Sequence, residues 1–297
     1  MTGIVMDGRV VGQKIRGAVK DEVDTLKDSG VKPFLATILV GDNPASKIYV
    51  KNKHAACHDA GIASRNIELN ADTRQPELLH TIDGLNREQA VTGVLLQLPL
   101  PKGLDDASAI MEIAPQKDVD GLHPFNLGQL WSKSAPLAPC TPRGVVMLLK
   151  YYGVQISGKH VVIVNRTKLV GRPLAQLFLN EDATVTVCHS KTHGLKELTR
   201  EADILVTAIG RRQQFTVGPE MVKPKAAVVD VGTSSLNGKL VGDVAFDAVL
   251  KKASFVTPVP GGVGPMTIAL LLYNTLLTAA MQRNARIGFS LEQLFNV

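Results

Sequence analysis

The chain has 297 residues, a length typical of two domains. Hydrophobic residues make up 45% and charged residues 20%, which is enough apolar material for folded cores and is not typical of a disordered chain. The net charge of +6 favours a slightly basic surface or attraction of an anionic ligand. Aromatic residues amount to only 4% and the basic residues are dispersed, so we expect no nucleic-acid partner.

The three cysteines, Cys57, Cys140 and Cys188, are far apart and form no Cys-x-x-Cys pair. This spacing predicts buried thiols in a reducing compartment rather than disulfides or a zinc ribbon. No run of 18 or more apolar residues is present, so we expect no membrane span. The first ten residues contain Asp7 and Arg9 and lack the apolar core of a secretory signal, which favours a cytoplasmic location.

Short apolar or β-branched runs alternate with longer amphipathic segments along the chain. The predicted strands are residues 33–40, 63–69, 91–97, 160–164, 184–187, 204–208, 226–231 and 254–257. The predicted helices are residues 9–27, 44–60, 75–86, 107–113, 143–152, 172–179, 195–201 and 265–283. This alternation predicts an α/β protein with mostly parallel sheets that are buried on both faces.

A proline-rich stretch with Pro136, Pro139 and Pro142 is typical of a domain boundary. We expect one domain to comprise residues 1–139 and 266–297, because the long C-terminal helix is predicted to return to the first domain. Residues 140–265 are expected to form the second domain.

The strand 160–164 is followed by a polar loop that begins with Asn165, Arg166 and Thr167, and then by a helix with Pro173 near its first turn. A strand, a tight loop and a helix N-terminus favour a phosphate, because free amides and the helix dipole both attract an anion. The loop lacks the Gly-x-Gly-x-x-Gly pattern of dinucleotide-binding proteins, and a plain βα turn explains it about as well.

The next predicted strand ends in a basic loop with Ser190 and Lys191 and no acidic residue. In a dinucleotide fold, an acid here binds the ribose 2′-hydroxyl of NAD, whereas a basic environment accepts the 2′-phosphate of NADP. Arg166 offers a planar fork to a phosphate and Ser190 offers a hydroxyl, which together favour NADP. The alternative is a surface loop that is basic by chance.

Two further loops follow predicted strands, at residues 230–233 and 258–267. The second contains Gly261, Gly262 and Gly264, which allow a backbone to approach a ligand closely. A tight turn that needs positive φ explains the same glycines, and the two explanations are compatible.

Tyr49 and Lys53 lie four residues apart on one face of a helix that is expected to begin with Asn43 as its cap and Pro44 at its first position. By itself this pair is an ordinary helix face. Gln97 favours a functional role for the pair, because it is a lone amide at the end of an apolar strand. Open α/β sheets bind ligands at such strand ends.

The segment from Lys117 to Gly121 places Asp118 and Asp120 in one loop. Either carboxylate could accept hydrogen bonds from a ligand, and a common Asp-Gly turn is the alternative. His54 and His58 lie four residues apart on one helix with Cys57 between them, but no third ligand is evident, so we expect partly exposed helix histidines and no metal.

Five motifs together resemble the bifunctional methylenetetrahydrofolate dehydrogenase/methenyltetrahydrofolate cyclohydrolase family, in the same order and over nearly the whole chain. They are residues 40–53, 97–101 (Gln-Leu-Pro-Leu-Pro), 117–121 (Lys-Asp-Val-Asp-Gly), 139–142 and 260–267 (Pro-Gly-Gly-Val-Gly-Pro-Met-Thr). The resemblance implies two α/β domains around a cleft, the second a Rossmann-like doubly wound parallel sheet. It also implies a homodimer, tetrahydrofolate derivatives as substrates and NADP as cofactor.

The resemblance implies two consecutive reactions. First, 5,10-methylenetetrahydrofolate gives a hydride to NADP, and water then opens the resulting 5,10-methenyl cation to 10-formyltetrahydrofolate. Lys53 is the implied general base of the second step, Gln97 its partner, and Tyr49 its orienting and stacking neighbour. Asp120 is expected to bind the pterin, with Gly262 and Pro265 as further substrate contacts. The implied cofactor residues are Asn165, Arg166, Thr167, Ser190 and Thr233.

The chain departs from the family pattern at two places. Asn165-Arg166-Thr167 stands where the family usually has Gly-Arg-Ser, and Thr233-Ser234-Ser235 stands where Ile-Asn-Arg is common. We therefore expect cofactor affinity or NADP preference to differ from the family pattern, whereas Tyr49, Lys53, Gln97 and Asp120 follow it. The alternatives are an NADP-dependent dehydrogenase of another small substrate, and a non-catalytic folate- or nucleotide-binding module.

Overall fold

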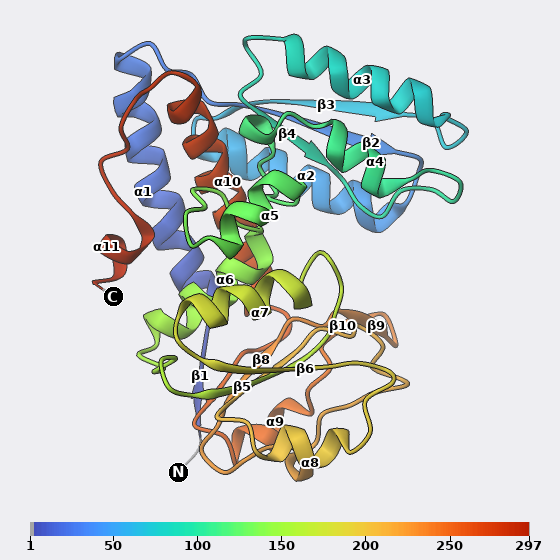
Figure 1. The fold of residues 1–297 in the computed structure, drawn as a ribbon, viewed down its shortest axis with the longest axis vertical. Helices are drawn as coiled ribbons and strands as arrows, with labels where there is room; N and C mark the ends of the chain where they lie inside the picture. The colour runs from blue at the N-terminus through green and yellow to red at the C-terminus, as the bar shows by residue number, and fades with distance from the viewer. Residues whose placement is uncertain (1–2, 297) are drawn as a thin grey trace. The chain divides into compact units, whose positions relative to one another are not determined.

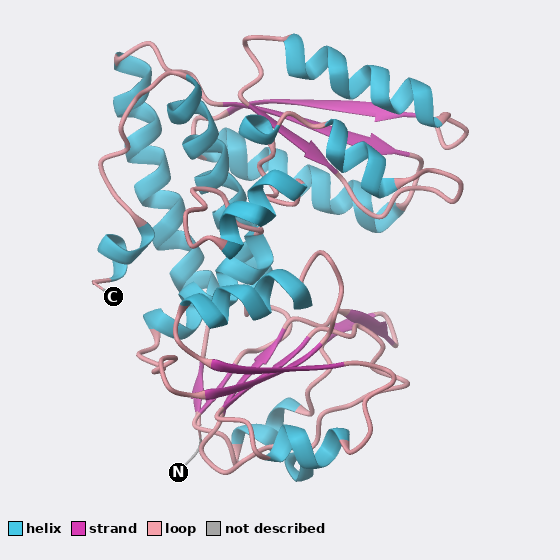
Figure 2. Cartoon of the chain, viewed as in Figure 1, coloured by secondary structure: helices cyan, strands magenta, loops and turns pink. Residues whose placement is uncertain are grey.

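The computed structural model describes residues 3–296, so the outermost residues of the predicted domains, 1–2 and 297, lie outside the described part. The chain forms two compact units (Figures 1 and 2). Among the described residues, unit 1 comprises 3–13, 139–270 and 291–296, and unit 2 comprises 14–138 and 271–290. The predicted α/β architecture is confirmed in each unit.

Unit 1 contains a six-stranded parallel sheet in the order β1-β11-β8-β7-β5-β6. The strands are β1 (Ile4–Val5), β5 (His160–Val164), β6 (Thr184–Cys188), β7 (Ile204–Thr207), β8 (Ala227–Asp230) and β11 (Phe255–Val256). The central strands β7 and β8 are buried along their whole length, as parallel strands covered on both faces require. A separate antiparallel hairpin joins β9 (Ser234–Leu236) to β10 (Lys239–Val241).

Helices cover both faces of this sheet, with α6 (Cys140–Tyr151) and α7 (Gly171–Asn180) on one face, and α8 (Leu195–Arg200) and α9 (Phe246–Leu250) on the other (Figure 1). The buried core under α8 and α9 is built from Val162, Leu205 and Val228, among others, with Leu198 and Phe246 packed against it. The sheet is therefore doubly wound, and the strand order reverses between β5 and β7. The unit also contains η2 (Pro219–Met221) and α11 (Leu291–Phe295).

Unit 2 contains a three-stranded parallel sheet in the order β3-β2-β4, with β2 (Phe34–Val40), β3 (Ala63–Leu69) and β4 (Gly93–Leu96). Its helices are α2 (Pro44–Asp59), α3 (Gln75–Arg87), α4 (Asp106–Glu112) and α5 (Pro124–Trp131), with a short η1 (Pro115–Lys117). Alternate residues of β2, Ala36, Ile38 and Val40, pack with α3 and α4. Because the side chains of a strand alternate, Leu35, Thr37 and Leu39 point to the opposite face.

Two long helices contribute to both units by residue membership. They are α1 (Gly8–Asp28), which divides after Gln13, and α10 (Val263–Gln282), which divides after Leu270. The predicted first domain therefore differs from the observed unit 2, because residues 3–13, 266–270 and 291–296 group with unit 1. Residues 3–13 belong to unit 1, because Ile4 and Val5 of β1 pair with β11. A two-residue strand has no periodicity that a sequence pattern can reveal.

Among helices of the described residues, α10 alone has the length and apolar composition that a membrane-spanning helix needs. However, 72% of its most apolar window is buried inside the protein itself. Its polar side chains are also used internally, since Asn274 Nδ2 donates to the carbonyls of Val119 and Ala138 at 2.8 and 3.0 Å. These contacts are those of a core helix.

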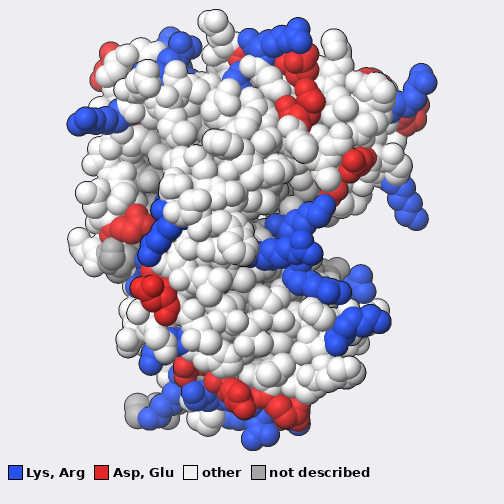
Figure 3. Space-filling view, viewed as in Figure 1, with Lys and Arg blue, Asp and Glu red and all other residues white. Residues whose placement is uncertain are grey.

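Charged side chains of both signs are visible on the face drawn in Figure 3. Lysine, arginine, aspartate and glutamate occur on both units of this face, and some of the lysine and arginine side chains adjoin one another in a small group. The small excess of basic residues is therefore not gathered on one unit of that face.

Candidate functional site

The side chain of Asn43 defines where α2 begins. Its Oδ1 accepts hydrogen bonds from the amides of Ala45 and Ser46 at 3.0 and 3.1 Å, and Pro44 occupies the first helical position. This is the predicted cap, and it satisfies amides that have no partner within the helix. The start of the helix is thus fixed, and so are the positions of Tyr49 and Lys53 along it.

Lys53 is joined to Gln97, 44 residues away. The Lys53 Nζ donates to Gln97 Oε1 at 3.0 Å, while Gln97 Nε2 donates to the carbonyl of Leu98 at 2.8 Å. The backbone amide of Gln97 donates to Ile38 O at 2.9 Å and so anchors this residue beside β2. Because the amide nitrogen is held by Leu98, the amide oxygen is left facing the lysine.

Tyr49 precedes Lys53 by four residues on the same helix and is 47% exposed. Its neighbour Ile48 is 61% exposed. Two large side chains with exposed apolar surface on one helix turn favour contact with a flat ligand over a role in the protein core.

Two titratable neighbours of Lys53 on α2, His54 and Cys57, have pKa values shifted toward their neutral forms. Burial, together with the charge of Lys53, lowers the pKa of His54, and burial raises the pKa of the Cys57 thiol to about 12. His54 Nδ1 is also hydrogen-bonded to Ser64 Oγ at 2.7 Å. Within residues 3–296 no group of three or more His, Cys, Asp or Glu side chains is placed to hold a metal ion.

A buried lysine anchors the loop that carries Asp120. Lys117 Nζ donates to the carbonyls of Leu85, Asn86 and Glu88 at 3.0, 2.8 and 2.9 Å, around the C-terminus of α3. These carbonyls lack partners within the helix, and the ammonium group also interacts favourably with the negative end of the helix dipole. Burial lowers the pKa of Lys117.

Asp118 has a structural place in the same loop. Its Oδ2 accepts from the amide of His123 at 2.7 Å and from Asn126 Nδ2 at 2.9 Å, and burial raises its pKa. Asp118 also forms a parallel bridge to Val94 of β4. Asp120, half-buried, therefore follows at the same edge of the sheet as Gln97. The residue pattern by itself left both aspartates open as ligand-binding groups, and the family resemblance selected Asp120. Neither gave Lys117 a role of its own.

In unit 1, the loops after β5 and β7 meet where the strand order reverses. Asn165 follows β5, and its Nδ2 donates to the carbonyl of Ala208 after β7 at 2.6 Å. In open α/β sheets, ligands bind outside the carboxyl ends of the strands at this switch point. The predicted cofactor loop thus lies at the expected edge of the sheet.

The sequence predicts free amides at the start of α7 that could bind a phosphate. In the structure, groups of the preceding loop accept hydrogen bonds from these amides. The amide of Gly171 donates to Asn165 Oδ1 at 3.0 Å, Val170 to Thr167 Oγ1 at 3.2 Å, and Arg172 to Thr167 O at 3.1 Å. Asparagine and threonine compete for helix amides in this way. An anion here would therefore depend on side chains such as Arg166, which is exposed.

The pairing register brings Arg166 and Ser190 to neighbouring strand ends. Val164 of β5 lies opposite Cys188 of β6, and Arg166 and Ser190 each follow this pair by two residues. Both are exposed, and no acidic residue lies in the loop between Cys188 and Thr192. Arg166 and Ser190 therefore follow neighbouring strands at the same edge of the sheet, as expected for two residues that bind one 2′-phosphate.

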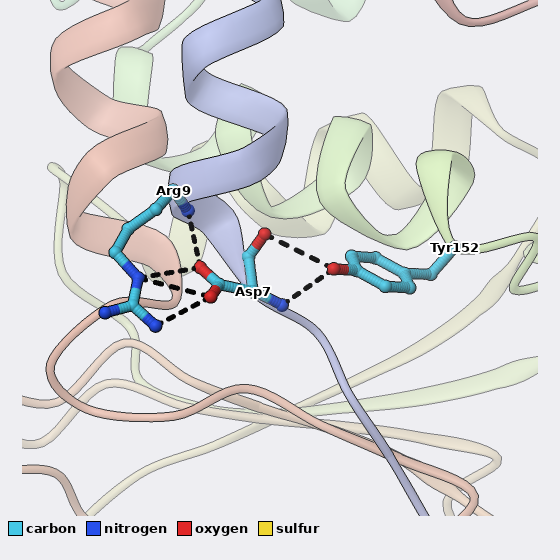
Figure 4. Close-up of polar contacts among 3 residues, drawn as sticks. All are labelled: Asp7, Arg9 and Tyr152. Atoms are coloured by element: carbon cyan, nitrogen blue, oxygen red, sulfur yellow. Dashed lines mark hydrogen bonds and ion pairs between the residues drawn. The ribbon is translucent and has the colours of Figure 1, made fainter.

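The glycine loop before α10 is fastened to the start of α1. The amide of Gly8 donates to Gly261 O at 2.9 Å, and Gly261 has a φ of +110°, which only glycine adopts readily. Asp7 caps α1 through the amide of Arg9 at 2.8 Å and pairs with its guanidinium at 2.7 Å, which lowers the pKa of Asp7 (Figure 4). The Tyr152 hydroxyl accepts from the amide of Asp7 at 2.9 Å.

The predicted site residues fall into two sets. Unit 2 holds Tyr49, Lys53, Gln97 and Asp120, of which the structure joins Lys53 and Gln97 directly. Unit 1 holds the remaining residues: Asn165, Arg166, Thr167, Ser190, Thr233, Gly262 and Pro265. Gly262 is buried and Pro265 is half-buried.

Comparison with known proteins gives consistent matches to both units. The tetrahydrofolate dehydrogenase/cyclohydrolase catalytic domain matches residues 6–120, and the NAD(P)-binding domain of the same family matches residues 139–283. The bifunctional protein FolD of Nitrosopumilus maritimus is 49% identical over 97% of this chain and 100% of its own length.

Two solved structures are similar over nearly the whole chain. The bifunctional enzyme FolD of Campylobacter jejuni has a TM-score of 0.91 and 46% identity, covering 94% of this chain and 99% of its own. A methylenetetrahydrofolate dehydrogenase-cyclohydrolase from Trypanosoma brucei, complexed with NADP and an inhibitor, has a TM-score of 0.91 and 40% identity, covering 96% and 100%.

Proposed function

The chain belongs to the tetrahydrofolate dehydrogenase/cyclohydrolase family, and from this premise we propose that Lys53 and Gln97 form the hydrolytic centre of a bifunctional enzyme. The enzyme oxidises 5,10-methylenetetrahydrofolate to the 5,10-methenyl cation and hydrolyses this cation to 10-formyltetrahydrofolate. The observation that carries the proposal is the 3.0 Å hydrogen bond between Lys53 Nζ and Gln97 Oε1.

The two reactions make different demands on the protein. Hydride transfer needs two flat rings held in the right orientation, and no side chain has to move a proton. Hydrolysis needs a base that takes a proton from the attacking water. We assign that second task to Lys53, and its half-buried position and its uncharged partner Gln97 support the assignment.

Lys53 must be neutral for part of the time to act as a base. A neutral amide such as Gln97 orients the amine without stabilising its ammonium form, unlike a carboxylate. The substrate for hydrolysis is itself a cation, so its binding further disfavours a second positive charge nearby. Burial raises the pKa of the Cys57 thiol to about 12, so this neighbour does not supply a thiolate that would stabilise the ammonium form of Lys53.

Tyr49 and Asp120 are proposed to hold the folate. The exposed ring of Tyr49 offers a stacking surface one helical turn from Lys53. Asp120 offers an acceptor-only carboxylate to the amino and ring N–H groups of the pterin. Lys117 and Asp118 support this role, because they fix both the α3 side and the α5 side of the loop.

Replacing Asp120 with alanine is expected to raise the KM for methylenetetrahydrofolate by about tenfold or more, since a charge-assisted hydrogen bond is lost. The turnover number is expected to fall less. Asp21→Ala, an exposed carboxylate on α1 of the same unit, is the matched control. Steady-state kinetics measure both, and an unchanged folate KM in Asp120→Ala would contradict the assignment.

NADP is the proposed cofactor rather than NAD. Arg166 and Ser190 end neighbouring strands, and the loop after β6 lacks the acid that would bind a ribose 2′-hydroxyl. The Trypanosoma brucei relative, complexed with NADP, supports the same choice. The resemblance to the family further supports a homodimer in the cytoplasm, and light scattering of the purified protein tests the dimer.

An absorbance assay with methylenetetrahydrofolate and either NADP or NAD tests the whole proposal. We expect reduction of NADP in preference to NAD, with transient formation of the methenyl species followed by its decay. Persistent methenyl product without decay would contradict the cyclohydrolase activity. Turnover of a hydroxy acid but not of the folate would instead favour an NADP-dependent dehydrogenase of another substrate.

A further inference from the structure

Asp243 is a fully buried carboxylate that the proposed chemistry does not use. It follows β10, and it accepts three hydrogen bonds from the end of β7 and the loop after it. The donors are Thr207 Oγ1 at 2.9 Å, the amide of Ile209 at 2.7 Å and the amide of Gly210 at 2.9 Å. One side chain therefore holds the loop that leaves the carboxyl end of β7.

A second buried carboxylate holds the backbone of Asp243 in turn. Asp230, at the end of β8, accepts from the amides of Asp243 at 3.0 Å, Val244 at 2.8 Å and Gly232 at 3.0 Å. Burial raises the pKa of Asp230 to about 6, and the nearby charge of Asp243 acts in the same direction. The loops after β7 and β8 are thus tied to the segment after β10 by two adjacent side chains.

Arg212 closes this network from the opposite direction. It lies in the loop after β7, and its Nη1 donates to the carbonyls of Gly242 at 3.1 Å and Val244 at 2.5 Å, on either side of Asp243. The space around Asp243 is also tight, because a Cβ added to Gly232 would lie 2.2 Å from Asp243 Oδ2. The carboxylate consequently has little freedom to take another position.

The loop held by Asp243 lies against both predicted cofactor loops. Its first residue, Ala208, accepts the hydrogen bond from Asn165 of the loop after β5. Its third residue, Gly210, packs on the backbone of Thr233, whose carbonyl would lie 3.0 Å from a Cβ at this position. Residues 208–210 therefore join the two loops at the strand ends where a dinucleotide is expected.

We propose that Asp243 is a positioning residue for the dinucleotide. It sets the affinity for NADP by holding residues 208–210 in the place against which the Asn165 and Thr233 loops rest. This inference depends on the proposed function, since it assumes that the edge of the unit 1 sheet binds NADP. It adds a residue that acts through the backbone of neighbouring loops and needs no contact with the cofactor.

The test is Asp243→Asn, which keeps the shape of the side chain but puts an NH2 donor where two amides and a hydroxyl also donate. The expected result is a rise of about tenfold or more in the Kd for NADP by calorimetry, and in its KM in the dehydrogenase assay. The cyclohydrolase turnover, measured with added methenyltetrahydrofolate, is expected to stay within about twofold of the parent, since Lys53 and Gln97 lie in unit 2.

Thr199→Val is the matched control for a general loss of stability. Thr199 is equally buried in unit 1, but its hydroxyl donates to Lys196 O within the α8 segment. A rise in the NADP Kd that Thr199→Val does not produce supports the inference, with melting temperatures compared for both variants. An unchanged Kd in folded Asp243→Asn, or an equal rise in both variants, overturns it.

Arg212→Met is the second test of the positioning role, to be used if Asp243→Asn does not fold. It removes the two hydrogen bonds that flank Asp243 and leaves the carboxylate in place, so a smaller rise in the NADP Kd is expected. An unchanged Kd in this variant overturns the inference. Failure of the proposed function is distinguishable, because the parent protein would then reduce neither cofactor with methylenetetrahydrofolate.

Discussion

Replacing Lys53 with methionine is expected to reduce cyclohydrolase turnover by at least about 100-fold, the typical contribution of a general base. Methionine keeps the unbranched side chain and removes the amine that contacts Gln97 at 3.0 Å. Dehydrogenase activity should remain measurable, because hydride transfer requires no proton to move. The measurement is the decay of added methenyltetrahydrofolate, alongside NADP reduction with methylenetetrahydrofolate.

Lys51→Met is the control for this substitution. Lys51 is exposed on the same helix, so its replacement changes the net charge of α2 equally without reaching Gln97. Both activities of Lys51→Met should match those of the parent. Hydrolysis at the parent rate in Lys53→Met would rule out Lys53 as the base, and parallel loss of both activities would indicate a binding role.

Replacing Gln97 with glutamate is expected to lower cyclohydrolase turnover by about 10- to 1,000-fold, because a carboxylate within hydrogen-bond distance stabilises the ammonium form of Lys53. The geometry is retained, since glutamate and glutamine have the same shape. The dehydrogenase reaction should be less affected, and its product would then accumulate as the methenyl species. The absorbance assay reports both changes in one experiment.

Gln97→Met separates the effect of charge from that of lost orientation. It removes the hydrogen bond to Lys53 and introduces no charge, so its hydrolytic activity should exceed that of Gln97→Glu. Equal losses in the two variants would show that the amide acts only by holding the lysine. Full activity in Gln97→Glu would contradict the requirement for a neutral amine.

The local features of this chain were predictable from its sequence. The spacing of apolar residues predicts the alternation of strands and helices, and the Asn43-Pro44 pair predicts the cap of α2. Predicted element ends agree with the observed ones to within a few residues, as for β3 and β5. The strand β1 and the hairpin of β9 and β10 were missed, since two- and three-residue strands carry no recognisable pattern. The short helices α5, α9 and α11, of five to eight residues, were missed as well, because one or two helical turns show too little periodicity.

The residue pattern of the loop 117–121 did not predict which of its polar side chains have a structural role. Lys117, Asp118 and Asp120 are all polar residues in one short segment, and nothing in their order tells which are structural. In the fold, Lys117 binds carbonyls some 30 residues earlier in the chain, and Asp118 binds the start of α5. The distinction depends on neighbours that only folding brings near.

The α/β class, the family and the candidates Lys53 and Tyr49 could all be read from the sequence, because periodicity and motifs are properties of residues that are close together in the chain. The family resemblance also implied that Gln97 partners Lys53, and the fold brings the two side chains within hydrogen-bond distance. Only the fold revealed that the loop at Asn165 caps its own helix and that Asp243 holds the loop after β7. The physical reason is that directional hydrogen bonds between distant segments depend on where the strands and helices pack.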